Sequence, residues 1–486
     1  MEKKVDLKQK TISGVFWQLL QKGSSQIVSF IVSILLARLV QPSEFGMVAM
    51  TSIFMAIAGV LTDSGLGTSL VQKKNVDDLD KNTVFFFGLF ISIIFYGILF
   101  FSAPLIARMY KTDLIVPILR IVGLSLLLSS FSSVQSSLVM REMDFRKYFY
   151  VTLASTIISA VVGLSLAFKG FGVWAIVFQN LVRTVSSVLV LFFMVRWIPC
   201  IMFSWQRLKR LYSFGLNLTA ASLVGTIFNE LRGFVIGLRF MPADLAFYNR
   251  GNSIPWLVND NVNGTISTVL FPAIAQLQDD KNAVKNSMRR AMMTSTFFIA
   301  PLMTTLAATS KQIVLLLYTE TWSAAIPFMQ VICLGYIFSV LGSANLQAIN
   351  AIGRTDITFK LEFIKKPIYL LLIIMGSFIS PLAIAAANSV YSVIGSAINA
   401  IPNKRLIGYS YREQITDIFP QLIFSIIAGG AAWCIGYIGG NLFLIFAMQL
   451  IISAGIYLLL ARLFRIESFC YIIETLYEYR TTQNNL

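Results

Sequence analysis

Long apolar stretches recur along almost the whole chain, and they constrain its fold more than any other feature. Each is close to the length of about 20 residues that a helix needs to cross a bilayer, and polar residues, Gly or Pro separate one from the next. We predict an all-α integral membrane protein with about fourteen transmembrane helices. The predicted spans are 13–37, 45–71, 83–105, 114–138, 150–168, 172–195, 212–238, 246–275, 291–308, 325–350, 359–379, 382–401, 418–438 and 441–461.

The composition excludes a soluble fold and argues against an enzyme. Of the 486 residues, 56% are apolar and 13% charged, and the mean hydropathy is +0.74. The spans leave no room for a large domain outside the membrane. The chain has no His, and its Cys residues are far apart, so we predict no catalytic residues, no metal site and no cofactor. The charged N-terminus and a long first span containing Lys22 predict a retained helix rather than a signal peptide.

Basic residues are distributed unevenly between the two sets of loops. An even number of spans puts both termini on one side, and with the N-terminus in the cytoplasm 28 of the 39 Lys and Arg residues fall in cytoplasmic segments. The outer loops hold six of them: Arg38, Arg108, Lys111, Lys169, Arg239 and Lys311. This asymmetry predicts that both termini are cytoplasmic. It also accounts for the net charge of +16 without a nucleic-acid partner.

Weak internal similarity divides the chain into two related halves. At an offset of 200 residues the segment PSEF falls on PADL, and the DKN at 80–82 falls on the DKN at 280–282. The first six spans thus map in order onto the next six, as in transporters built from parallel repeats. We predict two pseudo-symmetric six-helix lobes, at 1–200 and 201–405, and a region at 406–486 that holds the last two helices and a cytoplasmic tail.

Four segments carry a resemblance to a known family: ARLVQPSEFGMVAM, SGLGTSLVQKK, MREMDFRKY and FYNRGNSIPWLVNDNVNGTISTVLFPAIAQLQDD. With the repeat, they resemble the Wzx-type polysaccharide flippases, in the colanic and teichuronic acid exporter branch of the multidrug/oligosaccharidyl-lipid/polysaccharide exporter superfamily. The resemblance implies two lobes around a central cavity that opens alternately to each side of the bacterial inner membrane. It implies a flippase that moves undecaprenyl-pyrophosphate-linked oligosaccharide units to the outer leaflet for cell-surface polysaccharide. Glycosyltransferases and a polymerase of the same pathway are the expected protein partners.

Charged side chains inside spans are the first candidates for a transport site, because each costs about 2.5 to 3.5 kcal/mol on insertion scales. A pyrophosphate that crosses the membrane needs cations and hydrogen-bond donors. Gln18, Lys22 and Gln26 share one face of the first span, and NRGNSIPWLVNDNVNGT places many polar groups and Pro255 in the eighth. We predict a substrate-binding set of Gln18, Lys22, Gln26, Arg232, Arg250, Asn259 and Asn263.

Each of these assignments has a simpler alternative. Small polar stripes also let membrane helices pack closely. Arg232 could pair with Glu230 or reach the outer headgroups, and Arg250 could lie at the outer interface. Arg120 and Arg183 lie in less central helices and are expected to form structural ion pairs or to snorkel to the headgroups.

Asp63, Glu230 and Asp260 are candidates for ion coupling, because buried carboxylates are the usual relays for protons or sodium ions. A helix cap is the alternative for Asp63. Three other functions compete with the flippase. A multidrug and toxin extruder would share the fold but handle cations. A membrane glycosyltransferase or polymerase would need a larger loop or domain, and a scaffold would not need so polar an eighth span.

Overall fold

The computed structural model of the protein describes residues 2–63 and 65–474, with side chains from residue 13 onward except at 213, 214, 217 and 218. This part of the chain is helical and contains no strand. Among the described residues, twelve segments are long and apolar enough to cross a membrane. All fourteen predicted spans fall on helices, so the prediction of an all-α membrane protein is confirmed. Residues 475–486 of the predicted tail lie outside the described residues.

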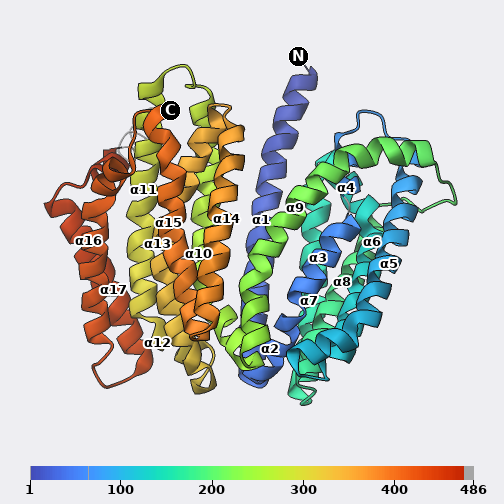
Figure 1. Cartoon of the computed structure of the whole chain (residues 1–486), viewed down its shortest axis with the longest axis horizontal. Helices are drawn as coiled ribbons and strands as arrows, with labels where there is room; N and C mark the ends of the chain where they lie inside the picture. The colour runs from blue at the N-terminus through green and yellow to red at the C-terminus, as the bar shows by residue number, and fades with distance from the viewer. Residues whose placement is uncertain (1, 64, 475–486) are drawn as a thin grey trace. The chain divides into compact units, whose positions relative to one another are not determined.

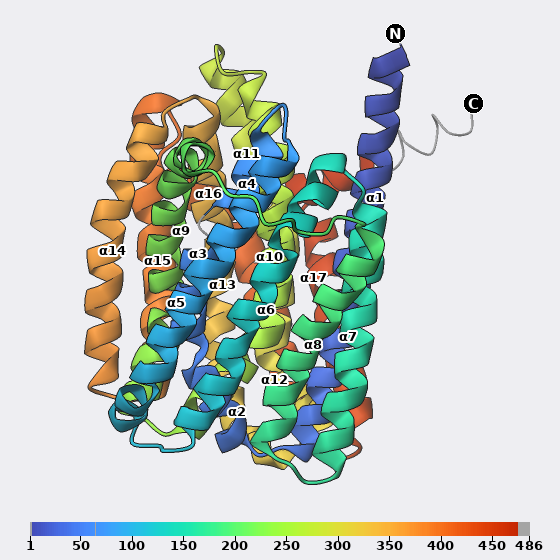
Figure 2. The same cartoon turned by 90° about the vertical axis from the view of Figure 1, so that its right-hand side faces the viewer.

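Contacts divide the chain into two compact units, Met1–Ala246 and Phe247–Leu486. Figure 2 faces unit 1, where α5, α6, α8 and α7 lie side by side in that order. The helices that lie wholly in unit 1 are α1 (Glu2–Leu39), α2 (Pro42–Met50), α3 (Ser52–Asp63), α4 (Leu66–Gln72), α5 (Asp78–Tyr110), α6 (Ile115–Glu142), α7 (Phe145–Phe168), α8 (Val173–Met194) and α9 (Trp205–Arg239).

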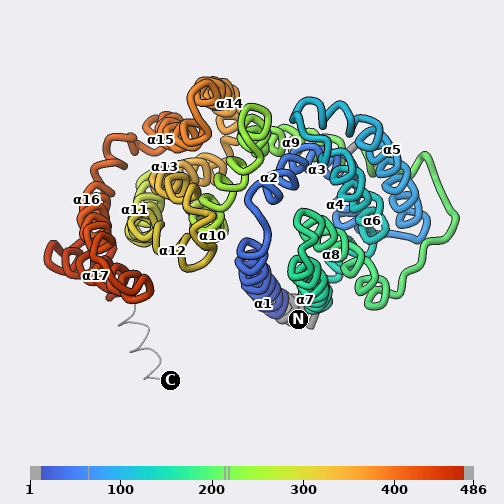
Figure 3. Tube along the Cα trace, turned by 90° about the horizontal axis from the view of Figure 1, so that it is seen from below, coloured from blue at the N-terminus to red at the C-terminus, as the bar shows by residue number. Residues whose placement is uncertain are grey.

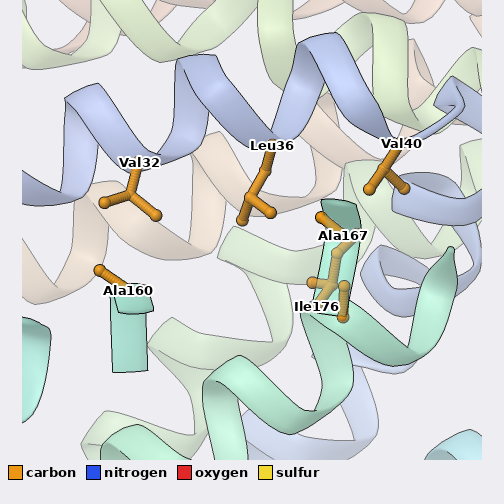
Figure 4. Close-up of a cluster of buried hydrophobic side chains, with 7 residues drawn as sticks. Val32, Leu36, Val40, Ala160, Ala167 and Ile176 are labelled. Carbon is orange, nitrogen blue, oxygen red and sulfur yellow. The ribbon is translucent and has the colours of Figure 1, made fainter. Parts of the chain in front are cut away.

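Apolar side chains at the helix crossings hold unit 1 together. One cluster joins Val32 and Leu36 of α1 and the adjoining Val40 to small residues on α7 and to Ile176 on α8 (Figure 4). Alanines at positions 160 and 167 let α7 approach α1 closely, as small residues do in membrane bundles. The long helix α9 packs against α3, α4 and α5, as Figure 1 shows. Although its sequence suggested the start of the second lobe, α9 therefore groups with unit 1, and the repeat itself stays a prediction.

Unit 2 is a second helical bundle. Seen end on in Figure 3, α13 lies among its neighbours α10, α11 and α15, while α16 and α17 lie at the edge of the unit. Its helices are α10 (Pro242–Ala275), which begins just before the boundary, α11 (Lys281–Ala308), α12 (Ser310–Leu317), α13 (Ile326–Ala351), α14 (Thr355–Ser377), α15 (Pro381–Leu406), α16 (Tyr411–Ile435) and α17 (Leu442–Leu463), with the 3₁₀ helix η1 (Glu320–Ala325).

The predicted span 45–71 is interrupted rather than continuous. Gly65, between α3 and α4, has a φ of +64°, which an L side chain adopts at a cost. A Cβ at this position would lie 2.7 Å from the carbonyl oxygen of Gly215 on α9. The close approach of α9 therefore leaves no room for a side chain at position 65, and a local sequence pattern could not reveal that approach.

The two segments aligned by the proposed repeat begin helices in the same way. Pro42 starts α2 and Pro242 starts α10, where the missing proline N–H costs nothing. Two residues later an acidic side chain reaches back to the chain: Glu44 Oε2 accepts from the Gln41 N–H at 3.1 Å, and Asp244 Oδ2 accepts from the Met241 N–H at 3.0 Å. A proline followed two residues later by an acidic side chain thus starts both helices in the same way.

Candidate functional site

The predicted polar stripe of α1 lies on a helix that packs against α7. Gln18 and Lys22 are exposed and Gln26 is half-buried. Contact with α7 is made by the neighbouring Gln21, whose Nε2 donates to Thr152 Oγ1 at 3.4 Å. The stripe thus remains accessible at the surface of unit 1, and its role in substrate binding stays a prediction.

Glu230 and Arg232 lie half-buried on α9, near α3. The Ser52 hydroxyl donates to Glu230 Oε2 at 2.8 Å, so a neutral group contacts this carboxylate. Two residues beyond Arg232, the Phe234 ring packs edge-on against Phe54 and Tyr110, with centroids 6.1 and 6.3 Å away. The face of α9 that carries Glu230 and Phe234 therefore combines a carboxylate with packed aromatic contacts, while Arg232, two residues from each, lies on another face.

Asp63, the last residue of α3, borders a cavity of about 350 Å³ enclosed by α3, α4, α5 and α6. The lining is dominated by hydroxyl groups and glycines. Six of its serines come from one run of α6: Ser129, Ser130, Ser132, Ser133, Ser136 and Ser137. Within the described residues no hydrogen bond or ion pair engages the Asp63 carboxylate, although Ser64, beside it, is not among those residues.

The serine hydroxyls line this cavity with hydrogen-bond acceptors. Five of the six donate to carbonyl groups of α6 itself, for example Ser130 to Leu127 at 2.7 Å and Ser137 to Ser133 at 2.9 Å. Because a hydroxyl has one hydrogen, each of these groups has only lone pairs left for the cavity. Together with the carboxylate they favour a cation or a donor-rich ligand over an anion.

Asn259 and Asn263 belong to a polar seam between α10 and α13. Asn263 Nδ2 donates to Asn259 Oδ1 at 2.9 Å and to Ser339 Oγ at 3.2 Å, and Ser339 in turn donates to Asn259. One contact extends the seam at each end: Tyr336 to Asn252 at 2.8 Å, and Gln347 to Ser267 at 3.0 Å. The polar side chains that make α10 unusual therefore hold two helices together, and a second role in substrate binding stays a prediction.

Arg250 lies at the start of the same helix, against two aromatic rings. Its guanidinium carbon is 5.1 Å from the Tyr318 ring centroid and 5.2 Å from that of Trp322. Both rings are fully buried, so the cation–π contacts fix the side chain in place. Pro255 follows one turn later, and α10 continues through it as a helix.

The remaining charged residues of the spans have varied surroundings. Arg120 stacks on the Phe100 ring at 4.1 Å and donates to the Phe100 carbonyl at 3.4 Å, which fits the structural role expected for it. Arg183 is exposed on α8, and Asp260 is half-buried on α10. Among the described residues, no group of three or more Cys, Asp or Glu side chains could hold a metal ion.

Sequence reasoning missed several polar groups that the structure brings together. The serine run SSFSSVQSS was visible in the sequence, but only the structure shows that it lines a cavity. Lys365, a buried lysine of α14, pairs with Glu362 at 2.5 Å. In unit 2, Asn345, Asn403 and Gln414 form a fully buried amide cluster that joins α13, α15 and α16.

Comparison with known proteins gives relatives of similar length. The chain is 22% identical over 446 residues to the lipopolysaccharide biosynthesis protein WzxC of Escherichia coli, and the match covers 89% of each chain. It is 26% identical over 352 residues to the succinoglycan biosynthesis transport protein ExoT of Rhizobium meliloti, covering 72% of this chain and 71% of that protein. The teichuronic acid biosynthesis protein TuaB of Bacillus subtilis is 23% identical over 421 residues, 85% of each.

Solved structures match the fold. The inward closed conformation of the lipid II flippase MurJ superposes with a TM-score of 0.76, at 16% identity, over 93% of this chain and 98% of that one. An inward-facing multidrug resistance transporter of the MATE family gives 0.63, at 13% identity, over 79% and 94%. At these identities the likeness establishes the architecture alone.

The predicted resemblance to polysaccharide exporters is confirmed at the level of the family. Residues 35–327 match the family described as "Polysaccharide biosynthesis protein", which is more than half of the chain. The matched region includes most of unit 1 and the polar helix α10. This chain, a multi-pass membrane protein with the fold of the MurJ and MATE transporters, belongs to the polysaccharide biosynthesis protein family.

Proposed function

We propose that this protein is a flippase for lipid-linked oligosaccharides. Its substrate is an undecaprenyl-pyrophosphate-linked unit, which it moves from the cytoplasmic to the outer leaflet by alternating access. Relatives named for lipopolysaccharide, succinoglycan and teichuronic acid biosynthesis, and a solved neighbour named as a lipid II flippase, support this assignment.

The observation that carries the proposal is the presence of basic side chains within predicted membrane spans. Lys22, Arg232 and Arg250 are basic side chains within or beside predicted spans, where a cation is retained only at considerable cost. A pyrophosphate leaving water needs such cations as partners. Arg250 is held in place by the rings of Tyr318 and Trp322, which lie against its guanidinium.

Neutral groups suit the other part of the substrate. An oligosaccharide presents many hydroxyl groups, each both donor and acceptor, and amide and hydroxyl side chains satisfy them. Gln18 and Gln26 on α1 and Asn259 and Asn263 on α10 have this chemistry. In alternating access the α10–α13 seam moves as one body, because its hydrogen bonds link the two helices over several turns.

A second candidate function is cation-coupled multidrug extrusion. The specific observation in its favour is the acceptor-lined cavity beside Asp63, which suits a cation rather than a pyrophosphate. The same cavity also fits the flippase if a proton or sodium ion drives transport, with Asp63 as the coupling group. Glu230 and Asp260 remain weaker candidates for this role.

The proposal includes a location and partners. The protein resides in the bacterial cytoplasmic membrane with both termini in the cytoplasm, as the loop charges indicate. It passes its product to a polymerase and receives its substrate from glycosyltransferases, and it carries out no covalent chemistry itself.

Complementation in cells that lack the protein tests this function. Wild type and the variants Lys22→Ala, Arg232→Ala and Arg250→Ala are compared at matched membrane abundance, with Arg183→Ala as a control that removes an exposed span arginine outside the site. Arg250→Lys separates charge from shape, because it keeps the cation but not the planar stack.

We expect deletion to trap the undecaprenyl-linked unit in the inner leaflet. The three site variants should fail to rescue export, while Arg183→Ala should rescue it. If cells that lack the protein still deliver lipid-linked sugar normally to the outer surface and lose resistance to cationic drugs, the protein is a multidrug extruder and not a flippase.

A further inference from the structure

A second pocket lies at the end of unit 1 where α4 stops and α9 begins. Its volume is about 420 Å³, and it is lined by Ser69, Gln72, Lys73, Arg207, Arg210 and Leu211. Three of these six side chains are cations and none is acidic. The pocket therefore has the chemistry of an anion site, and it is separate from the substrate residues discussed above.

A buried carboxylate holds two of the three cations in place. Asp80 is 0% exposed. It accepts from Lys73 Nζ and, at 3.3 Å, from Arg207 Nη1, while Asp77 Oδ2 lies 3.1 Å from Arg207 Nη2. An ammonium has three donors and a guanidinium five, so both cations keep donors for a further partner. Their positions are fixed before any ligand arrives, which lowers the entropic cost of binding.

Arg210 is the third cation, and it is held differently. Its side chain is exposed, and among the described residues it has no hydrogen bond or ion pair. Nearby, Arg141 donates to the carbonyls of Leu70 at 3.0 Å and Lys73 at 2.7 Å, so these acceptors at the end of α4 are already satisfied. Arg210 is thus available to a ligand, and its removal leaves the Asp80 ion pairs intact.

The segment that leads into α9 fixes the depth of this pocket in the membrane. Between α8 and α9 the chain is irregular, yet it exposes large apolar side chains such as Ile201, which is 96% exposed, and Trp205, the first residue of α9, is 68% exposed. An exposed tryptophan next to exposed apolar side chains is typical of the boundary between headgroups and acyl chains.

The first turn of α5 ties this segment to the pocket. The Cys200 N–H donates to Asn82 Oδ1 at 2.7 Å, and the Ser204 N–H donates to Thr83 Oγ1 at 3.2 Å. Asp80, which holds the pocket cations, lies on the same turn. The apolar segment and the cation pocket therefore form one assembly, with its cations at headgroup level.

We infer that this pocket binds the phosphate of an anionic phospholipid headgroup. Lys73, Arg207 and Arg210 contact the phosphate, and the apolar segment 198–205 lies against the adjoining acyl chains. Inorganic phosphate shares the charge but lacks the chains, so it should bind far more weakly. The sequence places this end of unit 1 at the cytoplasmic leaflet, where anionic lipids are concentrated.

Lipid titration of the purified full-length protein tests the inference. Thermal unfolding in detergent is followed with added phosphatidylglycerol, with phosphatidylcholine of the same acyl chains, or with inorganic phosphate alone. The variants are Arg210→Gln and a matched control, Lys209→Gln, which removes an adjacent exposed cation that does not line the pocket. Equal unfolding midpoints without lipid establish that both variants are folded.

Phosphatidylglycerol should raise the midpoint of wild type and of Lys209→Gln with the same affinity. Arg210→Gln should bind about fivefold more weakly, the effect of one basic residue at an anionic surface. Equal binding by the two variants, or equal stabilisation by phosphatidylcholine, would overturn the site. A full shift with inorganic phosphate alone would overturn the phospholipid as its source.

Discussion

The two units place polar groups in their interiors in opposite ways. In unit 1 the serines of α6 satisfy themselves on their own helix and line a cavity beside Asp63. In unit 2 the amides of Asn345, Asn403 and Gln414 hydrogen-bond to one another across three helices. Polarity within a membrane bundle thus serves either to line a ligand space or to join helices, and the hydrogen-bond partners distinguish the two uses.

The amide cluster of unit 2 offers the largest test of this difference. Asn345→Leu removes a side chain that bonds both Asn403 and Gln414, so the Gln414 amide oxygen loses its partner and each of the two amide nitrogens loses one of its two acceptors. We expect a loss of about 3 kcal/mol in unfolding free energy, because each unsatisfied buried group costs about 1 to 3 kcal/mol. Denaturant unfolding of the purified protein in detergent measures it.

The matched variant replaces all three amides by leucine. It should recover part of the loss, since no polar group is then left without a partner. A triple variant less stable than Asn345→Leu would show that the cluster does not act as a unit.

Substitutions of glycine test the same comparison, with a smaller expected change in unfolding free energy than Asn345→Leu. A Cβ on Gly335 of α13 would lie 2.7 Å from the backbone Cα of Ser389, whereas one on Gly88 at the unit 1 cavity would meet nothing within 4 Å. Gly335→Ala should therefore cost about 2 kcal/mol of unfolding free energy, through overpacking. Gly88→Ala should gain about 0.5 kcal/mol from the lower backbone entropy of the unfolded chain. Equal unfolding midpoints for the two variants would argue against a tight interior in unit 2 and an open cavity in unit 1.

Single hydroxyl groups give a smaller effect. Ser339→Ala cuts the seam between α10 and α13, and we expect it to cost about 0.6 kcal/mol, the average for such bonds between membrane helices. Ser133→Ala removes only a bond within α6 and should change stability by less. Thermal unfolding of both variants in one detergent compares them directly, and a larger loss for Ser133→Ala would reverse the assignment of the two regions.

The smallest effect on stability is expected at the cavity carboxylate. Asp63→Asn breaks no hydrogen bond to a described residue, so its unfolding midpoint should stay within about 0.5 kcal/mol of wild type. Transport should nevertheless fall if Asp63 binds the coupling ion. Unchanged export in the complementation assay would remove Asp63 from the mechanism while leaving the flippase assignment in place.

Local patterns in the sequence predicted the helices well and their partners poorly. Apolar length places nearly every span, because a helix in lipid must satisfy its own backbone. The close approach of the α9 backbone to Gly65 escaped prediction because the two residues are far apart in the sequence. The spacing of Asn259 and Asn263 put them on one face of α10, but their partner Ser339 lies 76 residues beyond Asn263.

The partners of side-chain hydrogen bonds were the hardest feature to predict. The sequence does not distinguish a serine that donates to its own helix, such as Ser133, from one that bridges two helices, such as Ser339. Only the structure shows the difference. Charged residues were easier, because their cost in lipid marks them. Even so, Lys365 went unnoticed in a segment where Glu362 offsets its charge.

The packing of α9 on α3, α4 and α5 also sets an order of events during biogenesis. Ribosomal synthesis delivers the N-terminal helices to the membrane first. Until residue 239 has followed, the faces of α3 and α4 that α9 covers stay open to lipid or to insertion factors. A nascent chain arrested after residue 200 should therefore remain bound to the insertion machinery, and one arrested beyond residue 246 should be released as a protease-resistant bundle.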